Sequence, residues 1–551
     1  MQHKPSLYYI IFLTLFALIF FMPFLGNTHL FDWDEINFAE IAREMVLSKN
    51  YMHPQINFQL FTEKPPLFFW LQAISMNIFG INEYASRFPN AMLGFIVLPV
   101  LFLIGKRLKN NLFGLLWAMA YACTILPHLY FKSGIIDPWF NFFIFMSLYG
   151  LTESYHKKIN HQFGFKWILL SGTMAGLAIL TKGPAAILIL GLTGCFVLLS
   201  NRFKSFLSVR QILTFSLLTV ATAGLWLGID YLQNGSQFIK EFTIRQWELF
   251  TTKDAGHGGF FLYHFVVLFF GCFPISAFFI QTVIKKEGDN TPAFHHFKRW
   301  MKVFFWVVLI LFSIVQTKIV HYSSLCYYPI SFFAAISLFN LIEKKWILNG
   351  VTKFLFVLSA IPFIIAPFLV VYLGKNLSLL KQLVSKDKFA TENIQAQIDW
   401  TGLEILPGIL LIGCIMLSYV YFKKSKISLS IALLFLGSVL FIQSTLYFLI
   451  NKIESISQRA NIEFWQLHSK EDCYKTTYHY KSYTQYFYGE IMPQKNNNYT
   501  DENWLLKGKI DKPVYISCRV NTKDEFEKEI TDAEFLYNKN GFYFYRRNPL
   551  P

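Results

Sequence analysis

A long series of apolar runs constrains this chain more than any other feature of its sequence. Windows of about 19 residues, the length used to detect membrane spans, find thirteen such runs. The runs lie near residues 8–25, 88–104, 112–126, 136–151, 167–180, 185–199, 212–229, 260–283, 303–315, 325–341, 354–373, 403–421 and 427–450. A helix needs about 20 residues to cross a bilayer. The sequence therefore predicts a polytopic α-helical membrane protein with about thirteen transmembrane helices.

The composition excludes a soluble enzyme with a single membrane anchor. Of the 551 residues, 54% are hydrophobic and only 15% are charged, against about 25% charged in an ordinary soluble domain. Most of the surface therefore cannot face water. The first run is long and no small-residue cleavage site follows it, so we interpret it as a retained helix and not as a secretory signal.

The positive charge of the chain is explained by membrane topology. The net charge is +16, which would also suit a nucleic-acid partner. If the N-terminus is cytoplasmic, however, the short inside segments hold 21 Lys and Arg against 4 Asp and Glu. The remaining charges nearly balance, as the positive-inside rule requires. The sequence predicts a cytoplasmic N-terminus and gives no support to nucleic-acid binding.

The long polar segments of the sequence are predicted to lie on the external side of the membrane. With thirteen spans, the loop at 26–87 and the C-terminal 100 residues both lie outside. From residue 451 the composition becomes mixed polar and aromatic, with strand-like pieces at 513–517 and 541–545. We expect a transmembrane domain at 1–450 and a small soluble α/β domain at 451–551. Its cysteines, Cys473 and Cys518, would face an oxidising compartment, and whether they pair is left open.

Three carboxylates open the first external loop, at Asp32, Asp34 and Glu35. The following residues, 36–49, have apolar side chains on one helical face and the polar Asn37, Glu40 and Glu44 on the other. This pattern predicts an amphipathic helix at the membrane surface. Acidic residues also suit a helix N-terminus, so capping is the alternative role of Asp34.

Six further charged or titratable residues lie near span ends or beside prolines. Pro65 and Pro66 stop a helix from running back through Glu63 and Lys64, and so fix an acid beside a base. Charges at membrane depth are functional candidates by default, and the candidates of this kind are Asp137, Lys182, Lys318 and His321. The alternatives are a solvated ion pair for Glu63 and Lys64, a helix start for Asp137, and snorkelling or interfacial anchoring for the two later lysines.

Three motifs in the first loop carry a specific resemblance. They read D-E-x-x-F-A-E-I-A-R-E-M at 34–45, E-K-P-P-L-x-x-W at 63–70 and F-G-x-N-E-x-A-S-R-F-P at 79–89. The order resembles the first loop of the lipid-phosphate-dependent glycosyltransferases of the membrane GT-C fold. That group includes the bacterial lipid A 4-amino-4-deoxyarabinose transferases and the protein O-mannosyltransferases. The resemblance extends more loosely through the spans and is weakest in the C-terminal region.

The resemblance implies a fold, a reaction and a location. We expect a GT-C fold and inverting transfer of a sugar from a polyprenyl-phosphate donor to a lipid A-like glycolipid. Transfer to protein hydroxyls is the alternative acceptor class. The enzyme would lie in a bacterial inner membrane among its lipids, with the active site and C-terminal domain periplasmic. A transporter or lipid flippase is the alternative of another class, but the paired halves with broken helices that are typical of transporters are not found in the sequence.

This chemistry needs a base for the acceptor and cations for the departing phosphate. The catalytic candidates are Asp34 as base, Asp137 as a second carboxylate, and Glu35. The candidates for the donor phosphate are Lys64, Lys182, Lys318, Arg87 and His321.

A metal site is a further implication of the resemblance. In some relatives a loop histidine and the acid of the E-K-P-P motif bind a divalent metal, which makes Glu63 and His257 candidate ligands. Gln246 stands where relatives have the first of two histidines. One carboxylate and one imidazole are a thin ligand set, so no cofactor is required and a divalent metal is left open.

Overall fold

The computed structural model describes residues 5–251, 258–285 and 291–549, and it is largely helical. Each expected span coincides with a helix or a bent helix pair. They are α1 (Ser6–Phe21), α4 (Glu83–Leu108), α5 (Asn111–Ala122), α7 (Asp137–Ile159), α8 (Phe165–Lys182), α9 (Ala185–Ser200), α10 (Val209–Asn234), α12 (Tyr263–Gly271) with α13 (Ser276–Ile284), α14 (Pro292–Ile314), α15 (Tyr327–Ile342), α16 (Gly350–Lys375), α19 (Leu406–Lys423) and α20 (Ile427–Phe448). The polytopic helical architecture is confirmed.

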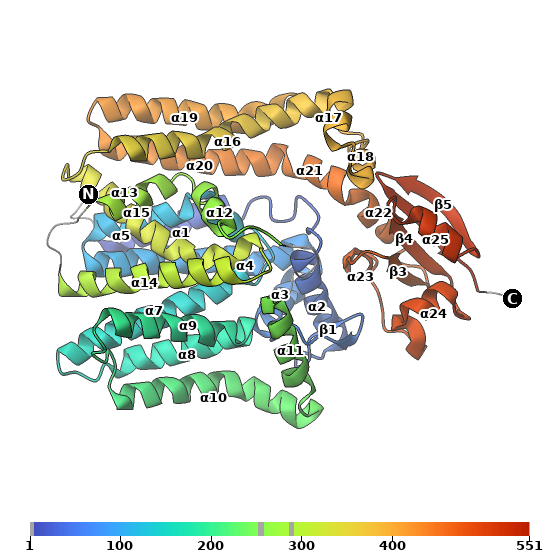
Figure 1. Cartoon of the computed structure of the whole chain (residues 1–551), viewed down its shortest axis with the longest axis horizontal. Helices are drawn as coiled ribbons and strands as arrows, with labels where there is room; N and C mark the ends of the chain where they lie inside the picture. The colour runs from blue at the N-terminus through green and yellow to red at the C-terminus, as the bar shows by residue number, and fades with distance from the viewer. Residues whose placement is uncertain (1–4, 252–257, 286–290, 550–551) are drawn as a thin grey trace.

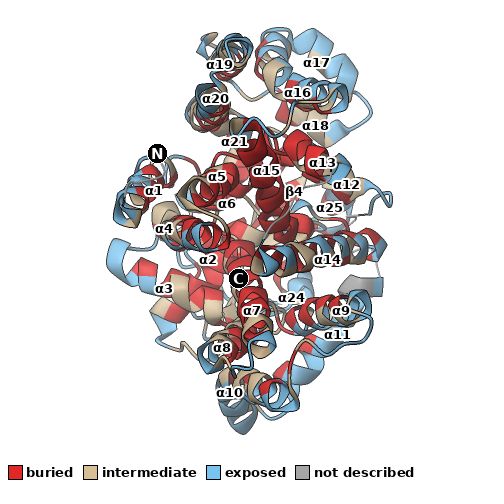
Figure 2. Ribbon diagram, turned by 90° about the vertical axis from the view of Figure 1, so that its left-hand side faces the viewer, coloured by how far each residue is buried: buried red, intermediate tan, exposed pale blue. Residues whose placement is uncertain are grey.

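Not every one of these helices is long enough to cross a bilayer alone. Within the described residues, six helical stretches are both long and apolar enough, and the pair α12–α13, bent by 110°, would make a seventh. The bundle has α15 at its centre, where every side chain from Tyr327 to Leu341 is buried. Figure 2 shows α10 and α19 at the periphery with many exposed residues. Their outward side chains are largely apolar, as expected where helices meet lipid.

The first external loop folds into a layer between the bundle and the C-terminal region (Figure 1). It contains α2 (Asp34–Ser48), a two-stranded hairpin of β1 (Gln55–Ile56) and β2 (Gln59–Leu60), and α3 (Leu67–Phe79). The bundle also carries shorter connecting helices: α6 (Ile125–Tyr130), α11 (Gln237–Thr251), η2 (Val320–Cys326), α17 (Leu377–Val384), α18 (Lys388–Asn393) and η3 (Leu403–Ile405).

The polar face of α2 is not at the water surface, which corrects the expectation of an amphipathic surface helix. Glu40 and Glu44 are fully buried. Arg43 donates to both oxygens of Glu40 at 2.7 Å and to the carbonyl of Ile491 at 2.7 Å. Burial beside Glu40 raises the pKa of Glu44 to about 9. The C-terminal region covers this face, so the charges are neutralised within the protein.

The C-terminal region contains a four-stranded mixed sheet in the order β3-β4-β6-β5, flanked by short helices. The strands are β3 (Tyr474–Tyr478), β4 (Val514–Arg519), β5 (Ala533–Lys539) and β6 (Phe542–Arg547). The helices are α21 (Ile450–Ser457), α22 (Arg459–Leu467), α23 (Thr484–Phe487), η4 (Asn497–Thr500), α24 (Glu502–Lys507) and α25 (Lys523–Glu529). Strands β3 and β4 pair in parallel, and the other two contacts are antiparallel. The strand-like pieces expected near 513–517 and 541–545 correspond to β4 and β6.

The two cysteines of this region do not pair. Both are free thiols. Tyr478 at the end of β3 lies opposite Cys518, whereas Cys473 precedes the start of the same strand. Cys473 is five residues of extended strand, or about 16 Å, from Tyr478, the residue that lies opposite Cys518. A disulfide needs Cα atoms within about 7 Å, so the two cysteines are too far apart.

A buried ion pair fixes the first loop to the bundle. Arg87 of α4 donates to both carboxylate oxygens of Glu35, at 3.1 and 2.8 Å. Its guanidinium also donates to the carbonyls of Leu25, Thr28 and His29. The desolvated charges are thus fully hydrogen-bonded, which is the condition under which a buried pair is tolerated.

We expect Arg87→Ala to destabilise the protein by about 3–5 kcal/mol, because Glu35 would remain as an uncompensated buried charge. Thermal unfolding of the purified protein in detergent should show a lower midpoint. Lys470→Ala is the matched control, since Lys470 forms an exposed pair with Glu490, and such pairs contribute little. Equal midpoints for the two variants would contradict the importance of the Arg87 pair.

Candidate functional site

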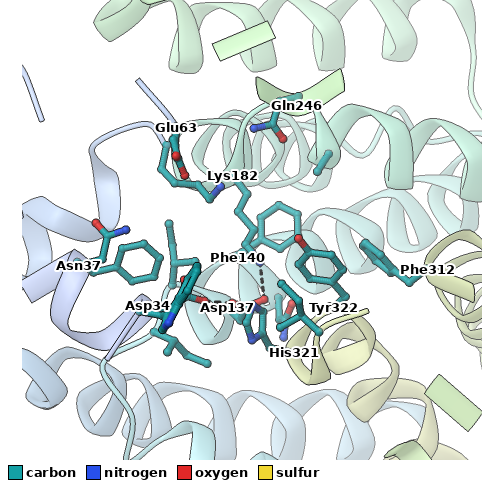
Figure 3. A pocket seen from close by; sticks show the side chains of 18 of the residues that line it. Asp34, Asn37, Glu63, Asp137, Phe140, Lys182, Gln246, Phe312, His321 and Tyr322 are labelled. Carbon is teal, nitrogen blue, oxygen red and sulfur yellow. Dashed lines mark hydrogen bonds and ion pairs between the residues drawn. The ribbon is translucent and has the colours of Figure 1, made fainter. Parts of the chain in front are cut away.

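A cavity of about 630 Å³ lies where the bundle, the first loop and the C-terminal region meet. Part of its wall, from α9 and the ends of α14 and η2, is apolar, and consists of Ala185, Leu188, Ile189, Leu311, Phe312, Val315, Ile319 and Leu325. The rest of the wall carries charged and aromatic side chains, several of which are labelled in Figure 3. The cavity therefore combines an apolar wall inside the bundle with a polar wall on the loop side.

Asp34 faces this cavity from the first residue of α2. Its side chain is 40% exposed, and Oδ2 lies 3.3 Å from Nε2 of His321 in η2. The preceding residue, Trp33, has φ of +78°, a conformation that is uncommon for a side chain of this size. The turn at Trp33 directs Asp34 into the cavity, so the carboxylate is accessible to a ligand and oriented by an imidazole (Figure 3).

Asp137 and Lys182 form an ion pair on another wall of the cavity. Asp137 begins α7 ahead of Pro138, and Lys182 ends α8. Their Oδ1 and Nζ atoms are 2.6 Å apart, and the carboxylate is buried (Figure 3). The second oxygen, Oδ2, has no hydrogen-bond partner among the described residues. A buried acceptor without a donor is costly, so this oxygen has an unused capacity to accept a hydrogen bond.

The E-K-P-P turn places Glu63 and Lys64 on the same cavity. Oε1 of Glu63 lies 3.4 Å from Nε of Arg245, which α11 contributes. Burial lowers the pKa of Lys64, and the nearby Glu63 opposes this effect. In the described part of the chain no carboxylate comes within ion-pair distance of the Lys64 ammonium. The turn therefore presents a cation whose charge is only partly balanced.

Three predicted site residues have their charges engaged elsewhere. Lys318, expected to bind phosphate, does not line the cavity; its Nζ donates to the carbonyls of Phe312, Ser313 and Val315 at the end of α14. Arg87, also expected at the phosphate, is bound to Glu35 and backbone carbonyls. Glu35 lines the cavity wall, but its oxygens accept from Arg87, from the amide of Phe31 and from the amide of Gly134.

Of the two candidate metal ligands, only Glu63 belongs to the described residues. His257 lies outside them. Glu63 has a guanidinium as its partner, and a cation there disfavours a second cation. The grouping of three potential ligands found in the described chain is His479, Glu525 and Glu529, which is exposed on the C-terminal region and does not line the cavity.

Several cavity residues were missed by sequence reasoning. Asn37 follows Asp34 by three residues and Asn141 follows Asp137 by four, so helical spacing could have indicated both. Arg245 is next to Gln246, the position at which relatives have a histidine. Lys481 and Tyr483 have no comparable signal, because they lie some 450 positions away in a region where the resemblance is weakest.

Comparisons with known proteins agree with this architecture. A family model described as dolichyl-phosphate-mannose-protein mannosyltransferase matches residues 63–226. The undecaprenyl phosphate-α-4-amino-4-deoxy-L-arabinose arabinosyl transferase of Wigglesworthia glossinidia brevipalpis is 25% identical over 343 residues, covering 61% of this chain and 59% of that protein. The enzyme of the same name from Pectobacterium carotovorum is 25% identical, covering 59% and 58%. The match thus spans less than two thirds of these relatives' own length.

The fold comparison covers nearly the whole chain. ArnT from Cupriavidus metallidurans, solved with undecaprenyl phosphate bound, superposes with a TM-score of 0.76 at 15% identity, covering 99% of this chain and 100% of that one. The archaeal oligosaccharyltransferase AglB from Archaeoglobus fulgidus gives a TM-score of 0.51 at 10% identity, covering 98% and 74%. The chain is therefore a polytopic membrane protein with the GT-C fold, and it resembles the lipid-phosphate-dependent glycosyltransferases for which ArnT is a solved example.

Proposed function

We propose that this protein transfers a sugar from a polyprenyl-phosphate donor to a glycolipid of the lipid A type. The observation that carries the proposal is the cavity itself, which joins an apolar wall inside the bundle to a cluster of cations and a ligand-accessible carboxylate. A donor with a long hydrocarbon tail, a phosphate and a sugar needs these three environments side by side. The similarity to arabinosyl transferases supports this class of donor and acceptor.

The donor fits the cavity by its chemistry. The prenyl chain would lie against the apolar side chains that α9 and α14 contribute to the cavity. The phosphate would meet Lys64 and Arg245, with Lys182 nearby. Charge-assisted hydrogen bonds to phosphate are among the stronger polar contacts. Positive charge positioned in advance also stabilises the negative charge that grows on the departing phosphate.

The proposed transfer is a single displacement. Asp34 accepts the proton of the acceptor group as the acceptor oxygen forms a bond to the anomeric carbon. The bond from that carbon to the phosphate oxygen breaks on the opposite face, so the anomeric configuration is inverted and the polyprenyl phosphate leaves. His321 holds the Asp34 carboxylate in position. Oδ2 of Asp137 accepts a hydrogen bond from a sugar hydroxyl.

The proposed location is the outer face of a bacterial inner membrane, with the N-terminus cytoplasmic. The positive-inside bias supports this orientation. The first loop and the C-terminal region lie at the same end of the bundle, away from the N-terminus (Figure 1). A sugar carried on a lipid suits a compartment where nucleotide sugars are scarce.

A protein acceptor is the second candidate. The mannosyltransferase family model that matches residues 63–226 favours it, because that family acts on proteins. The two acceptor classes are separated by mass spectrometry of lipid A and of surface glycoproteins from a deletion strain. Loss of a modification from lipid A alone would select the glycolipid, and loss from glycoproteins alone would select the protein.

We expect Asp34→Asn to lower the turnover number at least about 100-fold, the lower end of what a positioned general base contributes. The test is transfer by purified protein from undecaprenyl-phosphate sugar to lipid A. Donor affinity and the thermal midpoint should be unchanged, since the amide keeps the shape of the side chain. Asp501→Asn is the control, because Asp501 only caps α24. Near-normal turnover by Asp34→Asn would remove Asp34 from the mechanism.

We expect the kcat/KM for the donor to decline as the pH rises. The decline should occur at a pH below 10.5, the ordinary pKa of a lysine. The pKa of Lys64 is lowered by burial, so rising pH removes its charge early, and kcat/KM reports groups of the free enzyme. Lys64→Arg should abolish this alkaline decline, because arginine stays charged. The measurement is a pH profile of donor kcat/KM.

Lys318→Gln is the matched control for this profile. It removes a lysine that does not line the cavity and whose ammonium donates to carbonyls at the end of α14. We expect it to lower the thermal midpoint and to keep the alkaline decline. An unchanged decline in Lys64→Arg would exclude Lys64 as the phosphate contact.

A further inference from the structure

Helix η2 contacts two ion-paired groups of the cavity. Nε2 of His321 lies 3.3 Å from Oδ2 of Asp34. The ring centre of the next residue, Tyr322, lies 5.7 Å from the ammonium of Lys182, which pairs with Asp137. That separation is within the range of a cation–π contact. Two consecutive residues of η2 therefore meet charged groups from different segments, so the position of η2 relates these groups to each other (Figure 3).

A chain of two buried hydrogen bonds fixes η2 to α7. Nδ2 of Asn141 donates to Oγ of Ser324 at 2.8 Å, and that hydroxyl donates to the backbone carbonyl of His321 at 2.5 Å. Asn141 and Ser324 are both buried. Asn141 follows Asp137 by four residues, about one turn of the same helix. The chain therefore connects the backbone that carries His321 to the helix that presents Asp137.

Lys318 fixes the start of η2 to the end of α14. Its ammonium donates to the carbonyls of Phe312, Ser313 and Val315, at 3.0, 2.7 and 2.5 Å. The last carbonyls of a helix have no partner within that helix, so the ammonium satisfies acceptors that would otherwise be unpaired. Lys318 is buried and precedes His321 by three residues. The lysine therefore holds the turn through which the chain passes from α14 into η2.

Neither Ser324 nor Lys318 lines the cavity, whereas His321 does. A ligand in the cavity would meet the imidazole and not the two residues that support it. An effect of Ser324 or Lys318 on transfer therefore arises either through the side chains that η2 carries or through the stability of the whole fold. The experiment below separates these two routes.

We propose that Ser324 and Lys318 are positioning residues that act through His321. They hold the imidazole, and with it the Asp34 carboxylate, at a fixed place relative to Asp137. The inference rests on the proposed function, in which Asp34 accepts the acceptor proton and Asp137 binds a sugar hydroxyl. The rate of such a transfer depends steeply on placement, since a displacement of about 1 Å costs about 100-fold. Both supports are formed within the protein, so the site is preorganised before a substrate binds.

Ser324→Ala tests the chain to α7, because it removes the hydroxyl and leaves the cavity lining intact. The assay is transfer from undecaprenyl-phosphate sugar to lipid A by full-length protein in detergent. We expect the kcat to fall about 10-fold, less than the loss from a full 1 Å displacement. The KM for donor and the KM for acceptor should be unchanged, because no ligand contact is removed. Ser324→Thr keeps the hydroxyl and should restore the kcat.

Ser331→Ala is the matched control, because Ser331 is a buried serine of α15 with the same kinds of hydrogen bond. Its hydroxyl donates to the carbonyl of Tyr328, three residues earlier, at 3.0 Å, and accepts from Nε1 of Trp117 at 3.1 Å. Ser331 does not line the cavity. Ser331→Ala should lower the thermal midpoint about as much as Ser324→Ala does, and leave the kcat unchanged. Equal losses of kcat in the two variants would overturn the positioning role.

A double-mutant cycle with His321→Ala tests whether both supports act through the imidazole. His321→Ala should lower the kcat by itself, because Asp34 loses its partner. Lys318→Gln and Ser324→Ala should each lower the kcat when His321 is present, and cause no further loss when it is absent. Losses that multiply, or a normal kcat in His321→Ala, would overturn the inference. If the His321→Ala variants turn over too slowly to measure, the contrast between Ser324→Ala and Ser331→Ala decides alone.

The outcomes separate this inference from the proposed function. Wild-type protein that consumes no polyprenyl-phosphate sugar would overturn the proposed function. Active wild-type protein together with a normal kcat in Ser324→Ala would overturn the inference alone. The same holds if Ser324→Ala raises a KM and leaves the kcat unchanged, since a residue that acts by positioning the base affects the chemical step.

Discussion

The buried contact between Glu35 and Arg87 is the interaction on which the geometry of the cavity depends. Arg87 holds the Glu35 carboxylate against α4 and donates hydrogen bonds to carbonyls at the start of the first loop. The same carboxylate accepts a 2.6 Å hydrogen bond from the amide of Gly134, in the turn that leads to α7. One side chain therefore joins the segment that presents Asp34 to the segment that presents Asp137. In a site of low dielectric such a network is rigid, because every polar group that it releases would be left unpaired.

Most of the charged side chains that line the cavity form ion pairs, and among the described residues Lys64 and Lys481 have no carboxylate within ion-pair distance. Pairing allows carboxylates to be kept near a membrane boundary without the full cost of desolvation. Lys64 lies at the E-K-P-P turn, and Lys481 lies over the rings of Trp33 and Tyr483.

Much of the fold was predictable, whereas the grouping of the charges was predictable only in part. Asp34, Lys64, Asp137, Lys182 and His321 do line one cavity, since each is placed by a local signal such as a proline or a helix end. For Lys318 and Arg87 the same signals were misleading. A cation at the end of a span looks identical in sequence whether it faces a ligand or donates to the free carbonyls of a neighbouring segment. The buried polar face of α2 was mispredicted because the covering surface lies more than 400 residues away.

The sequence by itself determined the membrane character, the order of the apolar helices and the turn that sets Glu63 beside Lys64, because hydropathy and proline geometry act over short distances. Only the tertiary structure decided which charges meet. Lys481 and Asp32 are brought to the same cavity by the packing of the C-terminal region on the first loop, and Glu35 is taken out of the reacting groups by Arg87. Contacts between distant segments depend on which surfaces are buried together, and no local pattern in the chain carries that information.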